Sequence, residues 1–172
     1  MDVGARSREY GLGMGADELW VESYQGEVLG ETLFGLLAER EEDPTRRYQL
    51  EMLTLLERST KVLAEPVLEN RRLDRGDTAA SVSNATAFAD ALEGVAWEDF
   101  AASILPVTTE FLAKYHQLVE LAVDGAELDV AKAYVAHEEA LATFARRSSG
   151  QESGDPLEAV LGLPHVVAAG SR

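Results

Sequence analysis

The sequence predicts an all-α protein, a bundle of four long helices with short extra helices. No stretch sustains the alternation of apolar and polar residues that is typical of a strand. Four long stretches instead carry apolar residues at helical spacing, separated by breaks rich in Gly, Asp and Pro. Apolar residues make up 46% of the 172-residue chain and charged residues 27%, as in packed globular domains. We therefore expect one domain over residues 17–172, preceded by a glycine-rich flexible segment over residues 1–16.

The first two helices are separated by a clear stop signal. The first is predicted over residues 17–42, with Asp17 as its N-cap. Asp43 and Pro44 then end it and start the second, because aspartate caps helices and proline is favoured at the first helical position. The second helix is predicted from Pro44 to about Leu68, with Pro66 kinking its last turn.

The later elements are predicted from composition and from Gly and Pro breaks. In chain order they are a long polar connection over residues 70–84, a short helix over 86–94, long helices over 97–123 and 128–147, and a short apolar tail over 156–170 that packs back on the bundle.

Charge and cysteine content exclude several kinds of protein. Fifteen Lys and Arg against 31 Asp and Glu give a net charge of −16, which repels nucleic acids and anionic membranes. Cysteine is absent, which excludes disulfides, thiolate catalysis and cysteine-ligated metal clusters. No apolar run is long enough for a membrane span or forms a signal-peptide core. A soluble, cytoplasmic protein is expected.

Polar side chains fall inside the apolar stripe of each long helix when residues are placed at about 100° per residue. Burying an ionised carboxylate without a partner costs several kcal/mol, so inward glutamates need a cation, a proton or hydrogen bonds. A single such glutamate commonly bonds to a neighbouring Tyr or Thr, whereas several glutamates and a histidine on separate helices indicate a metal site. The inward set is Glu27 and Glu31 in the first helix, Glu57 and Thr60 in the second, Tyr115 in the third, and His137 in the fourth.

The first two helices resemble those of the ferritin-like superfamily, whose di-iron bundles carry one Glu on each of two helices and Glu-x-x-His on the other two. GEVLGETLF (residues 26–34) resembles the first metal-bearing helix, with Glu31 as the natural ligand and Glu27 as an alternative. LLERST (residues 55–60) resembles the second, with Glu57 in place and Thr60 where histidine is expected.

The other two helices match this family in part. The third offers Tyr115 where the family has a glutamate. YVAHEEA (residues 134–140) keeps the histidine as His137, with Tyr134 in place of the glutamate. Three of the six family ligand positions are kept, so the resemblance implies one metal ion at most rather than two.

The favoured function is a small-molecule enzyme that binds one Fe(II) or Mn(II) through Glu31, Glu57 and His137. Open coordination positions would suit an oxygenase or hydroxylase. Tyr115 and Tyr134 would line its pocket, and Glu138 would replace a ligand if the fourth helix is rotated.

Two alternatives keep the same bundle without a metal. A buried glutamate beside a histidine can act as an acid–base pair in an isomerase or cyclase. Alternatively, the bundle is a non-enzymatic small-molecule binder or a homodimer. An apolar row on the first helix, opposite its glutamates, favours dimerisation or coverage by the terminal segments: Leu29, Leu33 and Leu36.

Overall fold

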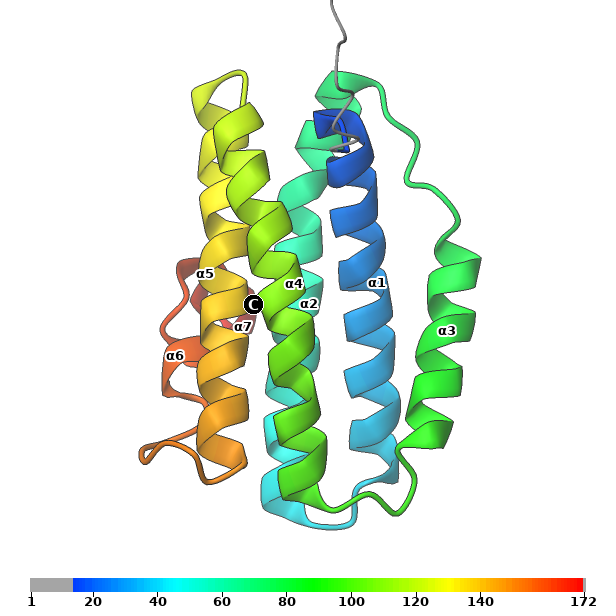
Figure 1. The fold of residues 1–172 in the computed structure, drawn as a ribbon, viewed down its shortest axis with the longest axis vertical. Coiled ribbons are helices and arrows are strands. Elements are labelled where there is room, and N and C mark those ends of the chain that lie inside the picture. The colour runs from blue at the N-terminus through cyan, green and yellow to red at the C-terminus, as the bar shows by residue number, and fades with distance from the viewer. Residues whose placement is uncertain (1–13, 172) are drawn as a thin grey trace, which may run out of the picture.

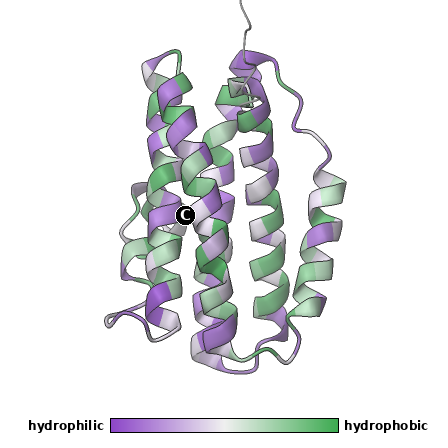
Figure 2. Ribbon diagram, viewed as in Figure 1, coloured by the Kyte–Doolittle hydropathy of each residue, from purple (hydrophilic) through white to green (hydrophobic). Residues whose placement is uncertain are grey.

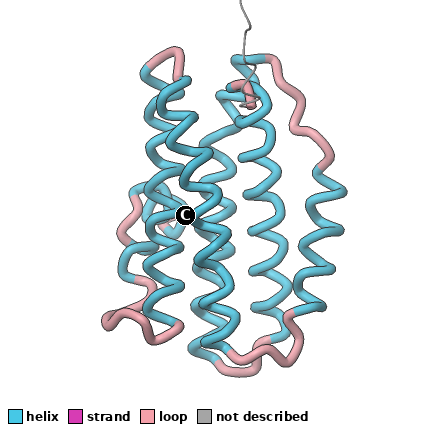
Figure 3. The backbone as a smooth tube through the Cα atoms, in the orientation of Figure 1, coloured by secondary structure: helices cyan, strands magenta, loops and turns pink. Residues whose placement is uncertain are grey.

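A computed structural model describes residues 14–171, and within this range the chain forms helices and loops but no strand (Figure 3). This confirms the predicted all-α helical bundle. The prediction of a flexible segment falls mainly on residues 1–13, which lie outside the described range. The helices are α1 (Ala16–Arg40), α2 (Pro44–Arg71), α3 (Thr78–Ala91), α4 (Trp97–Leu121), α5 (Gly125–Ser148), α6 (Glu158–Leu161) and α7 (Pro164–Gly170).

The four long helices form two antiparallel pairs, α1 with α2 and α4 with α5 (Figure 1). The chain crosses between the pairs through α3, which runs back along the outside of α1, so that α2 and α4 point in the same direction. Among the described helices, α3 packs closely against α1 alone. The two short helices at the end of the chain pack on α2 and α5, as expected for the apolar tail.

Aspartate caps start α2 and α5, whereas α1 begins at Ala16 with Gly15 as its N-cap, so the prediction of Asp17 as that cap is wrong. Asp43 accepts hydrogen bonds from the backbone N–H groups of Thr45 and Arg46, and Pro44 is the first residue of α2. Asp124 caps α5 in the same way, through the N–H of Glu127. None of the described helices is long and apolar enough to cross a membrane.

The predicted connection over residues 70–84 is wrong in extent. The second helix continues past Pro66 to Arg71, and α3 already begins at Thr78. Asp77 explains the early start, because its carboxylate accepts a hydrogen bond from the N–H of Ala80 and thereby caps a segment rich in alanine. The connection without helical structure is therefore short, and most of the crossing is made by α3.

The hydrophobic core consists of two clusters, one in each half of the bundle. One contains Phe34 of α1, Leu53 of α2 and Phe144 of α5. The other contains Trp20 of α1 and Leu68 of α2. Each long helix contributes to both clusters, and between the two contributions each has at least one buried polar residue: Glu27 on α1, Glu57, Ser59 and Thr60 on α2, Thr108 on α4, and His137 and Glu138 on α5. A polar layer therefore crosses the middle of the bundle.

Candidate metal centre

Every long helix supplies a buried side chain to the polar layer. None of these residues is at a helix end, where a polar side chain could cap the backbone. Each lies in the interior of its helix, and a polar side chain buried there requires a hydrogen-bond or charge partner. The residues are Glu27 on α1, Glu57 and Thr60 on α2, Thr108 on α4, and His137 and Glu138 on α5.

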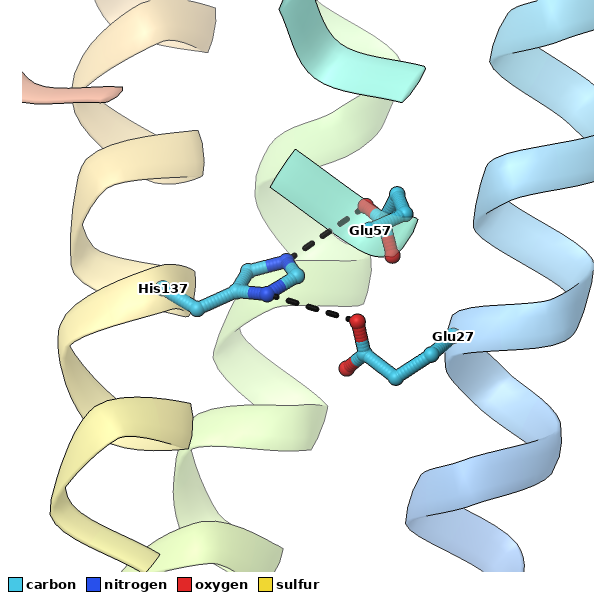
Figure 4. Close-up of side chains that lie close together, drawn as sticks. All are labelled: Glu27, Glu57 and His137. Carbon is cyan, nitrogen blue, oxygen red and sulfur yellow. Dashed lines mark ion pairs between the residues drawn. The ribbon is translucent and has the colours of Figure 1, made fainter. Parts of the chain in front are cut away.

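The imidazole of His137 lies between two carboxylates that come from the other helix pair (Figure 4). Its Nδ1 is 3.4 Å from Oε2 of Glu27, and its Nε2 is 3.4 Å from Oε1 of Glu57. His137 and Glu27 are each 1% exposed and Glu57 is 5% exposed. The three groups therefore meet in the buried interior, where α1, α2 and α5 face one another.

Thr60 fixes the orientation of His137. Its hydroxyl donates to the backbone carbonyl of Leu56 at 2.9 Å, and its oxygen lies 3.0 Å from both Nδ1 of His137 and Nε2 of His165. A hydroxyl has one proton, and that of Thr60 is donated to the Leu56 carbonyl. The Thr60 oxygen therefore accepts an N–H hydrogen bond from each histidine. This hydrogen bond places a proton on Nδ1 of His137 and leaves Nε2, which faces Glu57, available as a ligand.

The cluster contains more acid than base. Burial raises the pKa of Glu27 well above its ordinary value, although the charge of His137 opposes this shift. Burial also raises the pKa of Glu138 to about 8. For His137, burial lowers the pKa, but the charges of Glu27 and Glu57 outweigh that effect and raise it to about 10. Without a cation, these groups hold protons at neutral pH.

Two tyrosines cover the cluster on one side. The hydroxyl of Tyr115 is 3.5 Å from Oε1 of Glu27, and the ring of Tyr115 packs edge-on against Tyr134 at 4.8 Å between centroids. Burial raises the pKa of both phenols, so both are neutral. The hydroxyl of Tyr134 is buried without a hydrogen-bond partner. The tyrosines predicted to line the pocket therefore border the cluster, and neither supplies a charge.

The structure places Glu27 beside His137, whereas Glu31, the ligand preferred from the sequence, points away. Glu31 forms ion pairs with Arg58, at 2.8 Å, and with Lys61. Partial burial alone raises the pKa of Glu31, but the hydrogen bonds from Lys61 and Arg58 lower it overall. A carboxylate with two cationic partners has no need of a metal ion, and the residue one turn earlier takes its place.

Sequence reasoning passed over Gly30 and His165. A Cβ atom on Gly30 would collide with the carboxylate of Glu57, so this glycine makes the space that Glu57 occupies. Glycine in a helix interior costs about 1 kcal/mol relative to alanine. A glycine in the middle of a long predicted helix was therefore the one sign in the sequence that another group lies close to the backbone there.

The other residue that was passed over, His165, lies on α7. Burial lowers its pKa to about 4, so it is neutral.

The donor set fits a single divalent metal ion. One ligand atom from each of Glu27, Glu57 and His137 lies within 4.8 Å of the others. Two donors that are each about 2.1 Å from one metal lie about 3.0–3.4 Å apart at ordinary bond angles, which is the separation of His137 Nε2 and Glu57 Oε1. Oε2 of Glu27 has no hydrogen-bond partner. Two carboxylates and one imidazole suit iron or manganese but do not specify either.

The fold and the site together define a helical bundle with a buried Glu-Glu-His group that can hold a metal ion. No protein family, no curated protein and no solved structure matches this chain.

Proposed function

We propose that this protein is a small-molecule enzyme with a mononuclear Fe(II) or Mn(II) centre bound by Glu27, Glu57 and His137. The observation that carries the proposal is the convergence of these three side chains in the buried interior. Among the described residues, no Lys or Arg pairs with either carboxylate. A divalent cation neutralises both glutamates without requiring a proton on either.

We also propose that the bundle is ferritin-like. In support, α1–α2 and α4–α5 are antiparallel pairs joined by one long crossover, the connection of ferritin-like bundles. The ligands come from three of the four helices that carry them in that class. Tyr115, Tyr134 and Thr60 replace three of the six family ligands, which leaves enough donors for one metal ion.

In this proposal each residue has a defined part. Glu27, Glu57 and His137 hold the ion, Tyr115 hydrogen-bonds to Glu27, and Thr60 holds the His137 ring. A bound Fe(II) would supply the chemistry that activates dioxygen, and these three residues would hold it without filling its coordination shell. The proposed reaction is a hydroxylation, in which one oxygen atom of O₂ enters a C–H bond and the other leaves as water, with two electrons from an external reductant and two protons from solvent.

Metal content of matched variants tests the metal site. Protein purified without chelator from cells supplied with iron and manganese is analysed for metals, together with Glu27→Gln and Glu31→Gln. These variants differ by one turn of α1. We expect about one Fe or Mn per chain in the wild type and in Glu31→Gln, and almost none in Glu27→Gln. All three should melt cooperatively. No described Lys or Arg pairs with Glu27, so its amide is tolerated, and the ion pairs of Glu31 are partly exposed, so losing them costs little.

Three results would contradict the metal site. These are no metal in the wild type, equal metal in all three proteins, and loss of metal only in Glu31→Gln. Two metal ions per chain would contradict the mononuclear centre and indicate Glu138 as a further ligand.

A metal-free acid–base enzyme is the second candidate, and the raised pKa of Glu138, about 8, favours it. A carboxylic acid that keeps its proton at neutral pH can donate that proton to a substrate. Protonated His137 can then give a proton back to the Glu138 carboxylate. This candidate predicts an isomerase or cyclase that retains activity after dialysis against EDTA. Loss of activity on dialysis and recovery with Mn(II) would exclude it.

A further inference from the structure

A cavity of about 450 Å³ opens between α1, α3 and α4 and reaches the buried cluster. This volume lies within the range of small-molecule sites, about 300–1,000 Å³. Its walls are almost entirely apolar, while three glutamates contribute at its inner end: Glu27, Glu57 and Glu138. Figure 2 shows hydrophobic residues along the lower half of α1 and along α3, two of the three helices that border it.

The cavity exists because the helices around it do not all pack together. In the described chain α3 packs on α1 but makes no close contact with α4. Two of the three residues in the apolar row that the sequence assigned to a dimer contact or to the terminal segments, Leu29 and Leu33, line the cavity; the third, Leu36, does not. Gly26 contributes by its lack of a side chain, because a Cβ there would lie 3.3 Å from the Phe111 ring. These two leucines of α1 therefore face a space within one chain.

The shape of the cavity is long and narrow. Its wall on α4 extends from Phe100 to Tyr115, a rise of about 22 Å, and its wall on α1 from Gly26 to Phe34, about 12 Å. At the outer side, Phe88 of α3 and Val107 of α4 line the cavity while remaining 52% and 51% exposed. These two side chains form an apolar mouth.

One polar group at the inner end lacks a partner. Oε2 of Glu138 is buried without a hydrogen bond, and Glu138 itself is 5% exposed and lines the cavity. A buried oxygen without a hydrogen-bond partner is less stable than one that accepts a hydrogen bond. A ligand that reaches the inner end with a hydroxyl or another donor group satisfies this oxygen, and the rest of the wall accepts only an apolar body.

We infer that this cavity binds an elongated, apolar small molecule with a single polar group, which enters past Phe88 and Val107 and lies with its polar end at Glu138. The inference rests on the proposed function in one respect: it names the substrate class of the same centre. Binding itself needs no metal, so the two proposals can fail separately. The ligand is recognised by burial of its apolar surface, and the hydrogen bond fixes which end enters first.

The test uses metal-free full-length protein and two probes. Diphenylhexatriene, a rod-shaped hydrocarbon that fluoresces in apolar surroundings, is titrated into the wild type and two tryptophan variants, Val107→Trp and Val62→Trp. Val62 lies on α2 away from the cavity and is 52% exposed, which matches Val107. We expect saturable binding of one probe per chain, with a dissociation constant raised about tenfold or more in Val107→Trp and unchanged in Val62→Trp. Ser103→Trp, also exposed on the cavity wall, replaces Val107→Trp if that variant does not fold.

Decanol then tests the polar end. We expect it to displace the probe from the wild type and to bind about threefold to tenfold more weakly to Glu138→Leu, with the hydrocarbon probe unaffected by that change. Several outcomes would overturn the inference. These are absence of saturable binding, equal binding by both tryptophan variants, equal decanol affinity in Glu138→Leu, and a dimer by sedimentation that binds the probe only after dissociation. Metal analysis is a separate measurement, so loss of the metal proposal leaves these results interpretable.

Discussion

Gly30 is the residue that allows Glu57 to reach the centre of the bundle. In Gly30→Ala the added methyl group displaces the Glu57 carboxylate, which is the movable end of a flexible side chain. We therefore expect metal affinity to fall at least about tenfold. Stability should not fall, because alanine is favoured over glycine in a helix by about 1 kcal/mol. Titration with Mn(II) and thermal melting of the metal-free protein measure the two effects.

Gly35→Ala is the matched control on the same helix. A Cβ at Gly35 would meet only the Thr54 methyl, at an ordinary 3.8 Å. It should raise the melting temperature of the metal-free protein by about 2–4 °C and leave metal binding unchanged. If Gly30→Ala binds metal as well as Gly35→Ala does, then Glu57 is not a ligand.

The hydroxyl of Thr60 is predicted to act through His137. Thr60→Val keeps the shape of the side chain but removes the acceptor for Nδ1 of His137. The ring loses the bond that selects its tautomer, and metal affinity should fall about 10–100-fold. Thr54→Val is the control, because Thr54 also bonds to a backbone carbonyl of α2, that of Leu50, but has no histidine partner. Equal metal affinities for the two variants, measured by Mn(II) titration, would contradict this role.

The sequence predicted that His137 and Glu57 face inward, but it favoured Glu31 over Glu27 as the third ligand. Residues four apart differ by about 40° around a helix, so both fell on the same predicted face. The choice depends on α2, where Arg58 and Lys61 lie against Glu31. That pairing is a contact between helices, and a single helix considered alone contains no information about it.

At the scale of elements, α3 shows why the crossover was only partly predicted. Its sequence, TAASVSNATAFADA, is small and polar enough to resemble a loop. It forms a helix because Asp77 caps it and because Ser81, Ala85 and Ala89 bury a narrow face on α1.

The ends of the long helices were predicted to within a few residues, since their apolar stripes repeat over many turns. The cavity could not be predicted, because it depends on a helix that packs on one neighbour only.

An ion pair joins the end of α2 to the start of α5. The Arg71 guanidinium donates to both carboxylate oxygens of Glu127, at 2.6 and 2.8 Å, and the hydrogen bond from Arg71 lowers the pKa of Glu127. A carboxyl whose pKa is lowered in the folded state adds stability above its unfolded pKa and loses that contribution as pH falls through its folded pKa. We expect Glu127→Gln to lose about 1–3 kcal/mol at pH 7, and the loss to shrink steadily below about pH 4.5.

Urea unfolding at pH 7, 5, 4 and 3 measures this dependence. Glu110→Gln is the control, because Glu110 pairs with Lys114 on an exposed part of α4. Exposed pairs contribute little, so its unfolding midpoint should stay near that of the wild type throughout. A constant difference between Glu127→Gln and the wild type at every pH would show that the Glu127 charge is not what stabilises this contact.

At the scale of the whole molecule, the polar layer and the two apolar clusters on either side of it have opposite effects on the free energy of unfolding. The clusters provide the stability, whereas the layer holds Glu27, Glu138 and His137, whose pKa values are raised by burial or by the charges around them. A bundle that needed only stability would fill this layer with leucine, since apolar replacement of buried charges is commonly neutral or stabilising. The layer is therefore where this protein gives up stability for function.

The raised pKa values in the polar layer predict how the free energy of unfolding depends on pH and on bound metal. The folded, metal-free protein holds protons on Glu138 up to about pH 8 and on His137 up to about pH 10, whereas the unfolded chain releases them at ordinary values. The folded state thus binds more protons, and the free energy of unfolding should fall as pH rises from about 5 to 10, by on the order of 1 kcal/mol per pH unit. Metal binding displaces protons from its ligands Glu27 and His137, so its affinity and its stabilising effect should rise over the same range.

Melting curves at pH 5 to 9, each with EDTA and with Mn(II), measure both slopes. The wild-type curves should coincide near pH 5 and separate progressively above pH 6, the metal-bound protein being the more stable. In Glu27→Gln the two curves should coincide at every pH, because a ligand is missing, while the downward slope from Glu138 and His137 persists. A metal-free wild type that gains stability between pH 6 and 9 would mean that the layer holds no protons, and the charges of its glutamates would then be balanced in some other way.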